Sequence, residues 1–180
     1  MESKDNSILK HRLSLHLQLY RALWSVVWTL FARPFPRSYF NSWKVMLLRL
    51  FGAQIKKNAI IYSSAKVYNP KKLIMGEGSV LGDDVDCYNV DFIRIGKNVV
   101  ISQKVYLCTA SHNIYDGTFK LITAEIIIDD NAWIAADSFI GMGVRIGRNA
   151  VVGARSSVFK NVEENTIVGG NPAKFLKNRI

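Results

Sequence analysis

Residues 128–158 read IDDNAW-IAADSF-IGMGVR-IGRNAV-VGARSS-V, and a large aliphatic residue occupies every sixth position. Four residues after each aliphatic stands a small or β-branched side chain, and the residue directly after it is usually small or acidic. An amphipathic helix needs apolar spacing near 3.6, and a hairpin-linked sheet needs alternating runs separated by turns. A period of six instead predicts short flat strands joined by tight corners, with three sides closing each coil.

The same period runs upstream in three shorter registers. Their aliphatic or apolar positions are Ile55, Ile61, Val67 and Leu73, then Met75, Leu81 and Cys87, then Ile95, Ile101 and Leu107. Three hexapeptides make one coil, which divides the chain into 55–72, 75–92, 95–112, 128–145 and 146–163. One coil cannot bury its apolar face alone, so the coils must stack. We therefore predict an all-β main domain over 53–170, a parallel β-helix of about five coils, with glycine relieving strain where the backbone turns.

The N-terminal segment, residues 1–52, is expected to be helical. We predict one helix over 9–31, ended by Pro34 and Pro36, and a second over 43–51. The uncharged run 22–32 is too short to cross a bilayer. Two interpretations stay open: the helices pack on the main domain or on a partner subunit, or they form an interfacial membrane anchor with Trp24, Trp28 and Phe31 among the headgroups.

Charge and composition exclude several classes of protein. The chain has 180 residues, 49% hydrophobic and 21% charged, which is a globular composition. Residues 1–50 carry eight Lys/Arg and two Asp/Glu, most of the net +10. Elsewhere basic residues are dispersed among acids, so nucleic acid is not an expected partner. Two cysteines fit a reducing cytoplasm, so we expect a cytoplasmic protein, peripheral at the inner face of the membrane if the helices bind lipid.

The repeat is interrupted once, and the interruption predicts the functional site. Residues 113–127 must leave the coils as a loop, and long loops in compact repeats are usually functional. His112 stands at the root of this loop and is the one histidine on the coils. A neutral imidazole can take a proton from a hydroxyl group near pH 7.

These features resemble the hexapeptide-repeat acyltransferases. The segments Leu107–Asn113 and Ile128–Ala136, together with the leader Arg33-Pro34 and Leu48–Gly52, are most similar to the colanic-acid-type (WcaF-like) polysaccharide O-acetyltransferases. Asn113 and Lys120 stand where that branch often has an acidic residue and a proline. The resemblance implies a left-handed coil, although generic crossover rules favour the opposite hand. It also implies a homotrimer, acetyl-CoA as co-substrate, no metal, and direct transfer to a sugar hydroxyl.

The resemblance also implies roles for individual residues. His112 is the general base, and the Ala136 backbone N–H stabilises the oxyanion. Coenzyme A contacts are expected at Trp133, Ala135, Ala136, Gly153, Ala154, Ser157, Lys160, Pro172 and Lys174, the last two in a tail spanning 171–180. Acceptor contacts are expected at Asn89, Tyr88 and Asp91.

Three other functions fit the sequence less well. A γ-class carbonic anhydrase needs three metal-binding histidines, which these coils lack. An antibiotic or serine acetyltransferase would keep both fold and chemistry, and a non-catalytic β-helix scaffold would keep the fold alone. The leader helices favour the polysaccharide branch, and the intact His112 junction favours catalysis.

Overall fold

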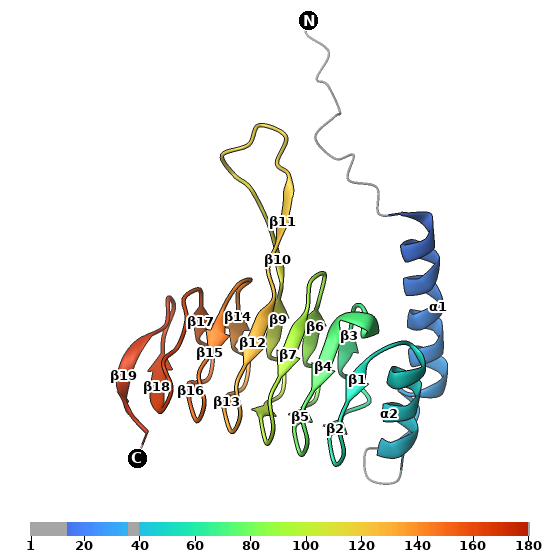
Figure 1. Ribbon diagram of the computed structural model, residues 1–180, viewed down its shortest axis with the longest axis horizontal. Helices are drawn as coiled ribbons and strands as arrows, with labels where there is room; N and C mark the ends of the chain where they lie inside the picture. Colours follow the sequence, from blue (N-terminus) through green and yellow to red (C-terminus); the bar gives the residue numbers. More distant parts are fainter. Residues whose placement is uncertain (1–13, 36–39, 180) are drawn as a thin grey trace, which may run out of the picture.

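The computed structural model describes residues 14–35 and 40–179. Two helices, α1 (Leu15–Phe31) and α2 (Asn41–Leu50), precede a stack of short strands wound into a parallel β-helix (Figure 1). The second helix begins two residues before the predicted Trp43. Of the first predicted helix, residues 9–13 lie outside the described residues.

The strands form three faces of a triangular prism, named here faces A, B and C. Face A holds β1 (Gln54–Ile55), β4 (Leu73–Met75), β7 (Ile93–Ile95), β12 (Ile126–Ile128) and β15 (Arg145–Ile146). Face B holds β2 (Ile60–Ile61), β5 (Val80–Leu81), β8 (Val100–Ile101), β13 (Trp133–Ile134), β16 (Val151–Val152), β18 (Thr166–Gly169) and β19 (Lys174–Asn178). Face C holds β3 (Lys66–Val67), β6 (Asp86–Tyr88), β9 (Tyr106–Cys108), β14 (Phe139–Ile140) and β17 (Ser157–Val158).

The predicted left-handed parallel β-helix is confirmed, with five complete coils and part of a sixth. Neighbouring coils pair in register, so that Ile101, for example, lies between Leu81 and Ile134. The aliphatic residues of the six-residue period point inward and are almost fully buried. Each therefore contacts its equivalents in the coils on both sides, which explains why the period is so strict.

The chain turns at most corners through a residue with left-handed backbone, three positions after the inward aliphatic residue. Left-handed backbone occurs there at Asn58, Asp84, Asn98, Lys104, Asn131, Asp137, Asn149 and Arg155, and at Gly78 and Gly143. Asn, Asp and Gly tolerate this conformation best. The expectation that glycine relieves strain where the backbone turns is confirmed at Gly78 and Gly143, whereas the glycines directly after the aliphatics have ordinary φ values. A Cβ on Gly76 would collide with the Gly96 carbonyl of the next coil, so close coil stacking requires that glycine.

The two ends of the prism are finished differently. At the first coil, the indole N–H groups of Trp24 and Trp28 donate to the Val67 and Ala65 carbonyls, at 2.7 and 2.9 Å. Asn41 of α2 accepts from the Ile61 N–H at 3.0 Å and donates to the Ala59 carbonyl at 2.8 Å. At the last coil, β19 pairs antiparallel with β18. The helices thus cover the first coil, whereas β19 is itself an exposed edge strand at the other end.

One arm projects from the prism (Figure 1). It is an antiparallel hairpin of β10 (Ala110–His112) and β11 (Leu121–Thr123). The chain therefore leaves the coil at residue 110, earlier than the predicted end of the third coil at His112. The earlier exit follows from the pairing of Ala110 with Thr123, which places His112 on the projecting arm.

Candidate active site

His112 lies on the arm, and its ring is oriented by one residue. Its Nδ1 is 2.7 Å from the Phe119 carbonyl oxygen, and the two rings stack at 4.6 Å with planes 10° apart. A carbonyl oxygen only accepts, so Nδ1 carries the proton in the neutral ring. The lone pair then resides on Nε2, the arrangement that a base needs. No feature of the sequence pointed to Phe119, whose backbone adopts a φ of 51°.

Asp91 lies at the base of the arm on the same side as His112. Its Oδ2 accepts a hydrogen bond from the Thr123 hydroxyl at 3.2 Å. Thr123 faces Ala110 across the hairpin, and His112 faces Leu121. Directly opposed residues share one side of a ribbon, as do residues two apart on a strand, so Asp91 and His112 border the same surface.

Asn89 does not fit the predicted acceptor contact. Its side chain is fully buried, its Oδ1 accepts from the Asn69 N–H at 2.9 Å, and its Nδ2 donates to the Asn69 carbonyl at 2.7 Å. The amide therefore joins two coils from inside the prism. Tyr88 remains partly exposed on face C, where its ring packs edge-on against Tyr68 at 4.8 Å.

The small residues predicted to contact coenzyme A form a continuous strip along the corner between faces B and C. Ala135 and Ala136 occupy, one coil earlier, the same corner as Gly153 and Ala154. The Ala135 N–H donates to the Val152 carbonyl at 2.9 Å. The Ala136 N–H has no acceptor among the described residues. A free N–H beside small side chains is a donor that a carbonyl oxygen can approach.

The strip continues into a cavity at the C-terminal end of the prism. The Ala173 N–H donates to the Ser157 carbonyl at 2.8 Å, which joins the turn before β19 to face C. Lys160, Pro172 and Lys174 line this cavity of about 380 Å³. Exposed lysines here suit the phosphates of an elongated anionic ligand.

Trp133 stands apart from this cavity, on face B. It is half-exposed, and its indole N–H donates to the Ser102 hydroxyl at 3.0 Å. It borders a shallow hollow together with Arg179 from beyond β19. The structure thus separates the predicted coenzyme A residues into the corner strip, the end cavity and the Trp133 hollow.

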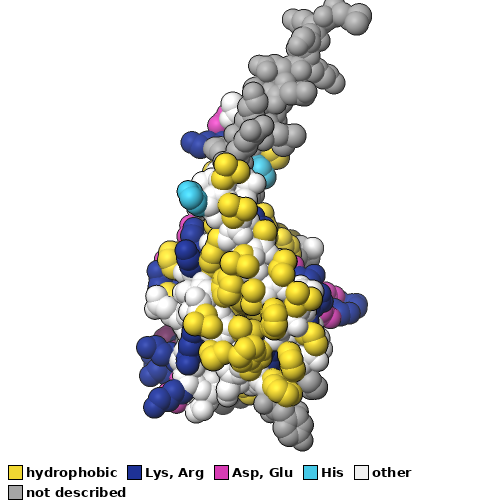
Figure 2. Space-filling view, turned by 90° about the vertical axis from the view of Figure 1, so that its right-hand side faces the viewer, with side chains coloured by type: hydrophobic (Ala, Val, Ile, Leu, Met, Phe, Trp, Pro, Cys, Tyr) yellow, Lys and Arg dark blue, Asp and Glu magenta, His cyan; other side chains and the backbone are white. Residues whose placement is uncertain are grey.

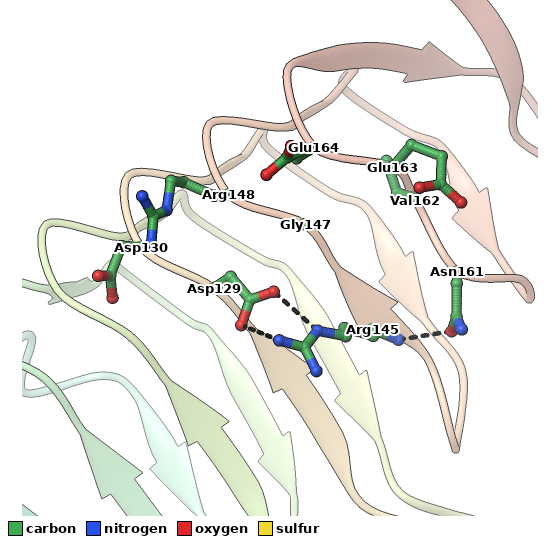
Figure 3. Close-up of a pocket in the computed structure, with 9 residues that line it drawn as sticks. All are labelled: Asp129, Asp130, Arg145, Gly147, Arg148, Asn161, Val162, Glu163 and Glu164. Carbon is green, nitrogen blue, oxygen red and sulfur yellow. Dashed lines mark hydrogen bonds and ion pairs between the residues drawn. The ribbon is translucent and has the colours of Figure 1, made fainter.

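A further cavity, of about 450 Å³, holds none of the predicted residues (Figure 3). Arg145 forms an ion pair with Asp129 there at 2.8 Å, and the backbone N–H of Arg145 donates to Asn161. Four carboxyl side chains and two arginines line it, a balance that disfavours an anionic ligand. No group of three metal-ligating side chains occurs among residues 14–35 and 40–179.

His112 and Ala136 do not meet within one chain. The arm leaves the prism between faces C and A, whereas Ala136 lies at the corner between faces B and C.

Neither cysteine is placed to act as the nucleophile of a covalent acyl-enzyme mechanism. Cys87 is fully buried, and burial raises the pKa of its thiol; the Cys108 thiol contacts the Ala110 carbonyl.

Comparison with known proteins agrees with this architecture. No protein-family model matches the chain. WcaF of Escherichia coli K12, named as an acetyltransferase of colanic acid biosynthesis, is 45% identical over 157 residues, which cover 87% of this chain and 85% of WcaF. A maltose O-acetyltransferase from Clostridium difficile 630 is 26% identical with a TM-score of 0.80, over 92% of this chain and 89% of that one.

A hexapeptide-repeat acetyltransferase from Vibrio cholerae is also 26% identical, with a TM-score of 0.81 over 92% of this chain and 93% of that one. A second structure of the Vibrio protein, 24% identical in its alignment, contains acetyl coenzyme A; its TM-score is 0.75, over 93% and 91% of the two chains. The extent of the match to WcaF and the shared β-helix lead to one conclusion. The chain belongs to the hexapeptide-repeat acetyltransferases, in the same family as WcaF, and is an acyltransferase.

Proposed function

We propose that this protein transfers an acetyl group from acetyl-CoA to a sugar hydroxyl of a surface polysaccharide or its precursor, with His112 as general base. The observation that carries the proposal is the oriented imidazole on the arm, with Nδ1 2.7 Å from the Phe119 carbonyl oxygen and the Nε2 lone pair free. WcaF and the maltose enzyme are named for related chemistry, which supports a sugar acceptor.

The reaction needs no covalent enzyme intermediate. Nε2 of His112 takes the proton of the acceptor hydroxyl while its oxygen attacks the thioester carbonyl carbon. The C–S bond then breaks, and the sulfur leaving group takes the proton back from the imidazolium. The Phe119 carbonyl keeps Nδ1–H in place throughout and stabilises the transient positive charge. Asp91 borders the same surface as His112. Of the three residues predicted to contact the acceptor sugar, it is the best placed to do so.

A second copy of the chain completes this site in our proposal. His112 and the Ala136 N–H lie at different corners, so the base and the oxyanion donor must come from different subunits. Three copies related by rotation place each arm over the corner strip of its neighbour. Such head-to-tail contacts close into a ring. The strip and the end cavity of one subunit then hold coenzyme A, and the arm of the next supplies the base.

An acceptor screen tests the reaction. Full-length protein is incubated with acetyl-CoA and a panel of oligosaccharides and nucleotide sugars, with free thiol release followed and products identified by mass. We expect one acceptor class to gain a single acetyl group. Thiol release that no acceptor accelerates would contradict the proposed function.

Subunit complementation tests the shared site. His112→Ala removes the base, and Ala136→Trp blocks the corner strip, so each variant alone is expected to be inactive. Random mixing of the two in equal amounts places an intact pair at about a quarter of the interfaces. Recovery of about a quarter of wild-type activity is expected. No recovery from folded mixed assemblies would contradict a site shared between subunits.

A further inference from the structure

Helix α1 is apolar on two opposite sides. Trp24 and Trp28 face the prism and are buried. On the opposite side, leucines and a valine follow each other at spacings of four, four, three and four residues, each more than half exposed: Leu15, Leu19, Leu23, Val26 and Leu30. A helix that only packed on the prism would carry polar residues there.

Helix α2 extends the same surface. The space-filling view of this end shows side chains of both helices merging into one apolar area (Figure 2). We call it the outer helix face, and its members are Leu15, Leu19, Leu23, Val26, Leu30, Phe31, Phe40, Trp43, Met46 and Leu50. Contiguous exposed apolar areas of this kind mark interaction sites.

The surroundings of the outer helix face are basic. From residue 6 to residue 76 the sequence has twelve Lys/Arg and no Asp/Glu, while twelve of the fourteen acids lie between 77 and 164. A cleft of about 310 Å³ between α1 and β3 is lined by Arg21, Arg33 and Lys66 without any acid. The Arg21 guanidinium lies 3.4 Å from the centre of the Tyr68 ring, and its Nε has no hydrogen-bond partner in the described chain.

The charge distribution indicates which partner binds the outer helix face. A second copy docking through the same face would bring two basic ends together with no carboxylate from 6–76 to pair them, which is unfavourable. An anionic lipid surface meets both requirements: apolar side chains enter the interface, and cations meet phosphate headgroups. Neither helix in the described part of the chain has the length and apolar content to cross a bilayer.

We infer that the outer helix face binds the surface of an anionic phospholipid membrane, with α1 and α2 lying in the plane of the interface. This inference goes beyond acetyl transfer and does not depend on it. It also corrects the predicted membrane anchor, because Trp24 and Trp28 pack on the prism and only Phe31 of the three predicted aromatics is exposed. The two helices cover one end of the prism (Figure 1). When they lie on the membrane, the axis of the β-helix therefore points away from the membrane surface.

Vesicle co-sedimentation of the full-length protein tests the inference. Vesicles of phosphatidylcholine with phosphatidylglycerol are compared with vesicles of phosphatidylcholine alone. We expect binding to the anionic vesicles, weakened by high salt. The double change Leu19→Ser with Leu23→Ser should lower the partition coefficient at least about tenfold, because two leucines that enter the membrane interface are lost. Arg33→Gln should lower it about fivefold.

The matched control is Leu176→Ser, which removes an equally exposed leucine from β19 at the other end of the molecule. It should leave vesicle binding unchanged. Wild-type protein that ignores anionic vesicles, or a double variant that binds as the wild type does, would overturn the inference. So would a smaller particle in lipid-free sedimentation of the folded double variant, since the outer helix face would then be a protein–protein interface.

Discussion

Asn89 provides the sharpest test of what the structure adds to the sequence. Its amide makes two hydrogen bonds with the backbone of Asn69, at 2.9 and 2.7 Å, and both residues are buried. Asn89→Ala leaves the Asn69 N–H buried without a partner, whereas the Asn69 carbonyl still accepts from the Lys72 N–H at 3.0 Å. An orphaned buried donor costs about 1–3 kcal/mol, so the variant should be destabilised by about that amount.

For a chain of this size, that loss lowers the melting temperature by about 2–12 °C. Thermal melts followed by circular dichroism measure it, with Asn178→Ala, an exposed change on β19, as the control. Below its melting transition, folded Asn89→Ala should keep the wild-type KM for the acceptor. An unchanged melting temperature together with a raised acceptor KM would refute the structural role and restore Asn89 as an acceptor contact.

Two further substitutions test the coil geometry and its electrostatics. Gly76→Ala should destabilise the protein by about 1–3 kcal/mol in denaturant titrations, because the new Cβ meets the Gly96 carbonyl, whereas Gly117→Ala has open space and should change stability by less than about 0.5 kcal/mol. Burial raises the pKa of the Asp86 carboxyl, so its ionisation opposes folding as pH rises through the folded-state pKa. Asp86→Asn should therefore raise the melting temperature at pH 7, and the gain should disappear as pH falls below the unfolded pKa near 3.8. The control is Glu77→Gln, a change of an exposed carboxyl group. An equal gain at pH 7 and below pH 3.8, or an equal gain from Glu77→Gln, would contradict this.

The coils were predictable because one physical requirement repeats. Every sixth residue must fill the prism axis, so Ile134 and its equivalents show the period directly in the sequence. The corners also left a signal, the Asn or Asp three residues after the aliphatic, as at Asn131 and Asp137. Glycine directly after the aliphatic serves a different requirement, close contact between coils, because a Cβ on Gly76 would meet the Gly96 carbonyl.

Other features depend on contacts that a single sequence does not reveal. Nothing local distinguishes Asn89, which joins two coils from inside, from an asparagine on the surface. The apolar residues of α1 were visible, but which of them face the prism depends on the partners found by Trp24 and Trp28. The stacking of Phe119 on His112 likewise arises from the hairpin pairing of the arm.

The rate of acetyl transfer by His112→Asn tests the central claim most directly. Asparagine can still donate a hydrogen bond toward the Phe119 carbonyl but has no basic lone pair in place of Nε2. With saturating acetyl-CoA and the acceptor found in the screen, kcat/KM should fall about 10²–10⁴-fold, while the dissociation constant for acetyl-CoA and the melting temperature stay at wild-type values. Acetyl transfer by the folded variant at the wild-type rate would contradict the assignment of His112 as the base.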